Sequence, residues 1–149
     1  MGVSPAAPRS LRVRRRFRSA SPCAFPATAG YGCVMDAIAL TVPTGRRFES
    51  VVALVLGGIG SRLDLPVARI DEMQMAVTNM AGSAAGTELM LEVAVHDDRV
   101  LLRIGPLQSG AASDPAQRQL VDPLVDGVRP LEREGLEWLE LDVSRRETG

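Results

Sequence analysis

The apolar and polar positions of residues 35–149 follow two periods, one typical of strands and one typical of helices. Apolar residues alternate with other residues over 38–42, 88–96, 100–104 and 136–143. A period of two puts every second side chain on the same face of a sheet, so these segments are predicted strands. A short polar turn between 96 and 99 predicts that the second and third strands form an antiparallel hairpin.

Two further segments have apolar side chains at spacings of three and four, which predicts helices over 46–63 and 66–85. Thr44 is the expected cap of the first helix. Asp64 and Pro66 are the expected cap and first-turn residue of the second, and Gly86 ends it. The predicted buried side chains of the second helix are Val67, Ile70, Met73, Val77, Met80 and Ala84.

Glycines and prolines predict a loop over 105–119, followed by a third helix that ends near 128. Its predicted buried side chains are Leu120, Val121, Leu124, Val125 and Val128. Pro123 leaves two alternatives, since Asp122 and Pro123 start this helix or Pro123 kinks it. The predicted order is β-α-α-β-β-α-β. We therefore expect an α+β fold, a two-layer sandwich whose mostly antiparallel sheet is covered on one face by helices.

The net charge of −1 hides two different parts of the chain. Residues 1–34 hold six arginines and no acid, whereas residues 35–149 hold eleven arginines and all eighteen acids, giving charges of +6 and −7. The first part lacks apolar periodicity, so we expect a disordered arginine-rich extension, or translation that starts at Met35. Nucleic acid binding through residues 9–18 and a transit peptide are the functional alternatives for this part. Residues 35–149 are expected to form one domain.

Composition excludes several classes of site. No apolar run reaches the length of about 18 residues that a membrane span needs, so we expect a cytoplasmic protein without a membrane partner. Cys23 and Cys33 both lie in the first part, which argues against a disulfide scaffold or a cysteine metal site. His96 is the only histidine and forms no zinc site by itself. The chain has no lysine, so no lysine side chain can hold a phosphate or act as a nucleophile.

The second predicted helix carries a polar stripe. Glu72, Asn79 and Ser83 fall within about 40° of one another at 3.6 residues per turn. Such a stripe on the open side of an α+β sandwich predicts a ligand site or a metal-bound phosphate site. The alternative is a solvated helix face.

The order of elements, together with three segments, resembles the anti-sigma factor serine kinases. These belong to the ATPase superfamily of gyrase, Hsp90, histidine kinases and MutL. Residues 35–66 are similar to the family's first strand, first helix and Leu-Pro connection. Residues 69–86 are similar to its second helix, and residues 120–146 to its final helix and strand. The resemblance implies the histidine-kinase-like ATPase fold for residues 35–149.

The resemblance also implies a nucleotide site, with departures from the family motifs. Asn79 stands at the position of the family's catalytic Glu, and Ser83 at that of its Mg²⁺-holding Asn. The amide of Asn79 cannot act as a general base, and the neutral hydroxyl of Ser83 is a poorer Mg²⁺ ligand than the carbonyl of an Asn. Gly105 and Gly110 match glycines of the Asp-x-Gly-x-Gly motif, whose Asp is absent. ATP and Mg²⁺ binding through these four residues, with Ser83 as the metal ligand, is therefore expected to be weak or lost.

We accordingly expect an anti-sigma factor-like regulatory domain that binds a sigma factor or an antagonist protein, with no assigned catalytic residue. A charge of −7 suits a basic protein surface. One alternative is an active serine/threonine kinase of the same switch, in which Asn79 and Ser83 line the nucleotide. Another is a nucleic-acid-associated protein that uses its arginine-rich segment. The resemblance also implies a homodimer.

Overall fold

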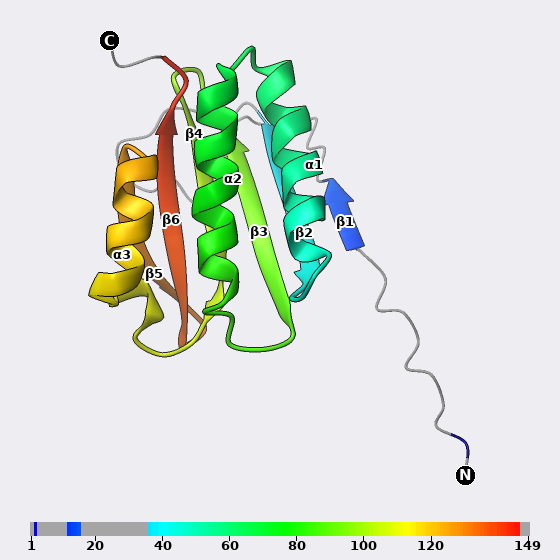
Figure 1. Ribbon diagram of the computed structural model, residues 1–149, viewed down its shortest axis with the longest axis vertical. Helices are drawn as coiled ribbons and strands as arrows, with labels where there is room; N and C mark the ends of the chain where they lie inside the picture. Colours follow the sequence, from blue (N-terminus) through cyan, green and yellow to red (C-terminus); the bar gives the residue numbers. More distant parts are fainter. Residues whose placement is uncertain (1, 3–11, 16–35, 147–149) are drawn as a thin grey trace.

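The alternating segments build an antiparallel sheet in the computed structural model, which describes residues 2, 12–15 and 36–146 (Figure 1). Within these residues the strands are β1 (Arg12–Arg15), β2 (Asp36–Pro43), β3 (Glu88–Val95), β4 (Arg99–Leu107), β5 (Gly127–Arg133) and β6 (Leu136–Ser144). Their order in the sheet is β1-β2-β3-β4-β6-β5, and every neighbouring pair is antiparallel. The predicted strand segments therefore lie within strands, except that the segment 88–96 extends one residue beyond β3.

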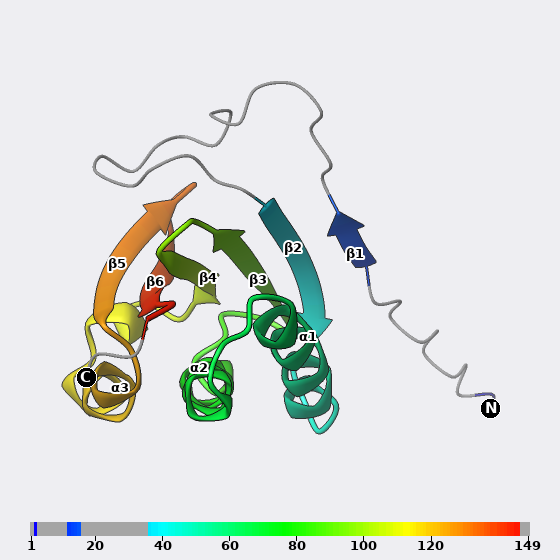
Figure 2. The ribbon, with the colours of Figure 1, turned by 90° about the horizontal axis from the view of Figure 1, so that it is seen from above.

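The helices cover one face of this sheet (Figure 2). They are α1 (Phe48–Arg62), α2 (Val67–Ala81) and α3 (Pro115–Val121), with short 3-10 turns η1 (Ala111–Ser113) and η2 (Asp122–Leu124). Fully buried apolar side chains such as Leu56, Val77, Ile104 and Leu141 form the core between helices and sheet. The expected α+β class, with an antiparallel sheet and helices on one face, is confirmed.

Two predicted helix caps are wrong. The residue before α1 is Arg47, which makes no capping side-chain bond. Thr44 instead donates its Oγ1 hydroxyl to the Thr87 carbonyl at 3.1 Å, because it joins the end of β2 to the start of β3. Asp64 adopts a left-handed φ of 52° in the turn between the helices, and Pro66 takes the cap position of α2 without a capping side chain.

The region from 105 to 135 differs most from the sequence prediction. β4 continues to Leu107, and α3 begins at Pro115, where the Asp114 carboxylate accepts the Ala116 N–H at 3.1 Å. The expected loop over 105–119 and helix ending near 128 are therefore wrong. Pro123 neither starts nor kinks that helix, since it lies in η2. The apolar residues that suggest one long helix are spread over three short elements, and Val128 belongs to β5.

β5 adds a strand that the predicted order lacks. It pairs with β6 along its whole length, from Gly127 opposite Asp142 to Arg133 opposite Leu136. Glu134 and Gly135 join the two strands, with positive φ values of 52° and 75°. Two consecutive left-handed residues suit the turn that matches the twist of a hairpin. The turn thus directs the chain back along β6.

β1 lies in the arginine-rich part of the chain, where the apolar pattern predicts no element. It pairs with β2, Arg12 lying opposite Thr41 and Arg15 opposite Ile38. Apart from residue 2 and β1, residues 1–35 lie outside the described residues, as do residues 147–149. Both cysteines and Met35 are among them. The disordered extension, the start at Met35 and the domain division there remain predictions.

Candidate functional site

α2 carries Asn79, whereas Ser83 lies beyond the end of that helix. Asn79 is half-buried and Ser83 is buried. The N–H of Ser83 donates to the Met80 carbonyl at 3.0 Å, and the Ser83 carbonyl accepts the N–H of Gln108 at 2.8 Å. The backbone of Ser83 is therefore already used to join α2 to the segment that follows β4.

The residues after Ser83 pair with the end of β4 rather than continuing the helix. Ala84 forms a bridge with Leu107, and the Ala85 N–H donates to the Pro106 carbonyl at 3.0 Å. The helix predicted to reach residue 85 thus ends at Ala81, because a strand takes over the hydrogen bonds of the next residues. As a result, Ser83 does not continue the helical stripe of Glu72 and Asn79.

Gly105 is part of β4, not of a turn after it. The alternation of the strand points it away from Ile104, a core residue, toward the sheet face without helices. A Cβ at Gly105 would lie 2.6 Å from Cγ of Trp138, far closer than atoms pack. Glycine is therefore required here because the Trp138 indole lies over the backbone.

Gly110 does lie in a turn, with a left-handed φ of 84°. Its N–H donates to Oε1 of Glu137 at 2.6 Å, and the Ala112 N–H donates to Oε2 of the same carboxylate at 3.2 Å. Glu137 therefore fixes the segment after β4 against the first residues of β6.

The four residues implied by the resemblance are not assembled into one site. The helix that carries Asn79 covers one face of the sheet (Figure 2), and Gly105 faces the other. Ser83 is tied through its backbone to Gln108, and Gly110 follows two residues later. A backbone hydrogen bond thus joins Ser83 to the segment that leads into the turn of Gly110. Asn79 and Gly105, in contrast, lie on opposite sides of the sheet.

These residues do not fit Mg²⁺ and ATP. Asn79 and Ser83 offer one amide and one hydroxyl, whereas Mg²⁺ prefers carboxylate and phosphate oxygens. Over residues 36–146 and β1, no group of three or more His, Cys, Asp or Glu side chains could hold a metal ion. Near Gly110 the Glu137 carboxylate takes two amides, and its charge would repel a phosphate.

A row of charges crosses the sheet face opposite the helices. Glu92, Arg103, Glu140 and Arg129 lie opposite one another on β3, β4, β6 and β5. Arg103 Nε donates to Glu140 Oε2 at 2.7 Å, and Arg129 donates to the other oxygen. Arg103 is only 6% exposed and Glu140 only 2%. Burial raises the pKa of Glu140, but Arg129 and Arg103 outweigh it and hold that pKa below its ordinary value.

Arg133 extends this network along the same face. Its two terminal nitrogens donate to the two carboxylate oxygens of Glu92, each at 2.9 Å. Its guanidinium carbon lies 4.6 Å from the centroid of the Trp138 ring, within cation–π range. The sequence shows these residues only as the polar positions of alternating strands, and the pairing requires the register.

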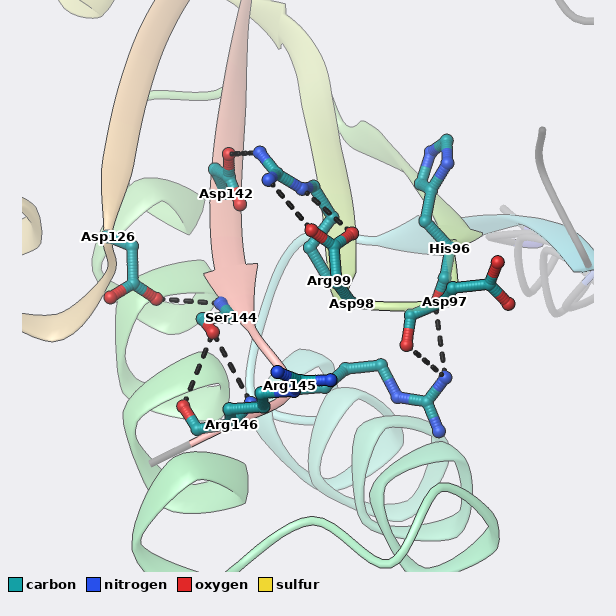
Figure 3. Close-up of polar contacts among 9 residues, drawn as sticks. All are labelled: His96, Asp97, Asp98, Arg99, Asp126, Asp142, Ser144, Arg145 and Arg146. Carbon is teal, nitrogen blue, oxygen red and sulfur yellow. Dashed lines mark hydrogen bonds and ion pairs between the residues drawn. The ribbon is translucent and has the colours of Figure 1, made fainter. Parts of the chain in front are cut away.

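Further charges join the turn between β3 and β4 to the end of β6 (Figure 3). Arg99 bonds Asp98 at 3.0 Å and Asp142 at 2.9 Å. The hydrogen bond from Arg99 lowers the pKa of Asp98. For Asp142, burial raises the pKa, the charges of Asp126 and Glu140 add to it, and together they outweigh Arg99.

Two arginines fasten the ends of elements in the same region. Arg145 donates from Nη1 to the carbonyls of His96 and Asp97, each at 3.1 Å (Figure 3). Arg69 of α2 donates to both carboxylate oxygens of Asp126 at 3.2 Å, and Asp126 also accepts the Ser144 N–H at 2.7 Å. The carboxylates of Asp98, Asp126 and Asp142 are each held by an arginine, which suits a structural role better than proton transfer.

The helices expose large apolar side chains, which form what we term the helical surface. Its members are Leu54 (79% exposed), Val67 (74%), Met75 (53%) and Leu120 (54%). The predicted burial of Val67 and Leu120 is therefore wrong, because both point out of the layer. The Gln74 side chain donates to the Ala53 carbonyl at 3.0 Å, which joins α1 and α2 one residue before Leu54 and Met75.

Comparison with family models gives no match, and comparison with curated proteins gives none either. Among the helices of the described residues, none is both long enough and apolar enough to cross a membrane.

Proposed function

We propose that the chain is a regulatory domain of the anti-sigma factor type that acts by binding a protein, either a sigma factor or an antagonist. The observation that carries the proposal is the helical surface. Four large apolar side chains are exposed on the helical layer of this small domain, and we take this layer as the surface that a partner covers. The mechanism is sequestration, in which this layer occludes a partner's functional surface until an antagonist competes.

Two other observations support the proposal. The element order from β2 to α3 agrees with the order expected for the histidine-kinase-like ATPase fold. The charge of −7 over residues 35–149 favours encounter with a basic surface, such as one that binds DNA.

Weak or lost nucleotide binding is part of the proposal. The packing of Trp138 on Gly105 and the bonds from Gly110 and Ala112 to Glu137 support it, because the fold itself uses the groups that the resemblance assigns to ATP. Asn79 and Ser83 then have no catalytic role.

Affinity purification of the full chain from its native host tests the proposal. A double variant, Leu54→Asp/Met75→Asp, places charge on the helical surface, and Leu136→Asp places it at an exposed site on β6. We expect the parent and Leu136→Asp to recover a sigma factor or an antagonist-like protein. The double variant should not recover it, and calorimetry should show that the purified partner binds the parent and Leu136→Asp but not the double variant.

Recovery of neither protein class with the parent chain would contradict the proposal. So would equal binding of the purified partner by the parent and the double variant, because the partner would then occupy another surface. Circular dichroism checks that each variant remains folded.

A further inference from the structure

The edge of the sheet at β2 is closed by a short strand. β1 pairs with β2 from Arg12 opposite Thr41 to Arg15 opposite Ile38, whereas β3 pairs with β2 along its full length. β1 lies beside β2 at the end of the sheet, with no further strand beyond it among the described residues (Figures 1 and 2). The hydrogen-bonding groups of β2 thus have a partner that contributes four residues.

The connection between β1 and β2 differs from that of the other edge hairpin. Glu134 and Gly135 join β5 to β6 in a two-residue turn, but residues 16–35 separate β1 from β2. A long connection carries a larger entropic cost of closure than a tight turn. The pairing therefore depends on what the β2 edge offers to an extended strand, namely a row of backbone N–H and C=O groups.

The sequence that occupies the edge is basic. β1 reads Arg-Val-Arg-Arg, while residues 35–149 carry −7. Arg14 takes the register position opposite Ala39, and Glu92 lies opposite Ala39 on the other side. The strand at this edge and residues 35–149 therefore carry charges of opposite sign.

We infer that the β2 edge is a docking site for an extended, arginine-containing strand of a partner protein. β1 is the chain's own occupant of that site, and the partner strand displaces it by pairing with β2 in its place. The backbone of β2 supplies the affinity, and the acidic domain selects a basic strand. This surface is separate from the helical surface, and the inference holds without the proposed function.

The test uses the full chain with β1 weakened. Hydrogen bonds alternate along an antiparallel strand, so one of two adjacent N–H groups points to the neighbour. Val13→Pro/Arg14→Pro therefore removes a bond to β2 in either case. Val13→Thr/Arg14→Thr is the matched control, because it loses the same arginine but keeps both N–H groups and favours a strand. The probe is a fluorescein-labelled peptide with the sequence of residues 11–16, Leu-Arg-Val-Arg-Arg-Arg.

Fluorescence anisotropy should show at least about tenfold tighter peptide binding by the proline variant than by the parent or the threonine control. Proline at the third and fourth peptide positions should abolish binding. Amides of residues 38–41 should exchange faster in the proline variant and regain protection with peptide. Equal affinities for the three proteins, or equal binding of the proline peptide, would show charge attraction alone and overturn the inference.

A second variant does not depend on weakening β1. Arg12→Cys/Thr41→Cys, with Cys23→Ser and Cys33→Ser, places two cysteines directly opposite each other across β1 and β2. Once oxidised, β1 is locked in place, and peptide binding should fall at least about tenfold relative to the reduced form. Equal binding in both forms would also overturn the inference, since the peptide would then not use the β2 edge.

Discussion

Two carboxyl groups on β6 respond to pH in opposite directions, although only one residue separates them. The pKa of Glu140 is lowered from its ordinary value of 4.5, so its contribution to stability is present above that value and is lost as the pH falls through the folded-state pKa. The pKa of Asp142 is raised from 3.8. Its contribution is therefore largest at low pH and declines as the pH rises through the raised value.

Glu140→Gln and Asp142→Asn test these signs against each other. Glu140→Gln leaves the buried Arg103 without its charged partner, and we expect a loss on the order of 3 kcal/mol of unfolding free energy at pH 7. This loss should shrink as the pH falls below the ordinary value of 4.5, whereas any loss from Asp142→Asn should grow over the acidic range. Urea unfolding between about pH 3 and 7 measures both. Parallel profiles for the two variants would contradict the assigned environments.

Gly105 is the residue whose role changes most between the resemblance and the structure. Gly105→Ala should cost about 1–3 kcal/mol, because the new methyl group meets the buried Trp138 indole and the indole or the strand must shift. Gly82→Ala is the control, since a Cβ there meets nothing within 4 Å and the backbone has a right-handed helical conformation. Urea unfolding should show a much smaller change for the control. Equal stabilities of the two variants would contradict close packing by Trp138.

At the scale of single residues, the sequence predicts which face a side chain takes but not its partner. The alternation in β6 places Trp138, Glu140 and Asp142 together on one side of the strand. It does not pair Glu140 with Arg103, because that ion pair joins residues 37 positions apart. Only the register between β4 and β6 brings them together.

At the scale of elements, prediction succeeds where one period runs long enough. α1, β3 and β6 each contain a clear apolar period, and their predicted positions are confirmed to within a few residues. α3 and η2 are too short to show a period of their own. In β5 the apolar residues Val128 and Leu131 are three apart and do not alternate, so the apolar residues of this region together imitate a helix. β1 has only one apolar residue, Val13, and therefore shows no apolar period. It is identified as a strand only by its pairing with β2.

The crossing of α1 and α2 gives a matched pair of glycine substitutions. A Cβ on Gly60 would lie 2.6 Å from Cδ1 of Ile70, whereas a Cβ on Gly58 meets nothing within 4 Å. Gly60→Ala should therefore destabilise the fold by about 1–3 kcal/mol, and Gly58→Ala should stabilise it by roughly 0.5–1 kcal/mol through helix propensity. Thermal and urea unfolding measure both changes.

The double variant Gly60→Ala/Ile70→Ala should recover part of the loss, because the smaller side chain makes room for the new methyl group. A Gly60→Ala variant as stable as Gly58→Ala would show that the two helices do not approach closely at this point.

At the scale of the whole molecule, the sheet divides two kinds of chemistry. One face carries the apolar core and the helices, and the other carries the charged row from Glu92 to Arg129. The class of fold follows from local periods, so the sequence predicts it. The candidate nucleotide site needs distant residues to meet on one side of the sheet, and Asn79 and Gly105 do not.

A thermal-shift titration of the full chain with Mg²⁺ and ATP tests this arrangement as a whole. A site with a Kd of about 10 µM would add ~2.7 kcal/mol at roughly 1 mM ligand. For a chain of this size that is a rise in Tm of about 8 °C. We expect a rise of less than about 1 °C, because the fold already uses the groups near Gly105 and Gly110. Mg²⁺ alone is the control. A large rise that Asn79→Ala/Ser83→Ala removes would instead favour the active kinase, because these two residues would then line the nucleotide.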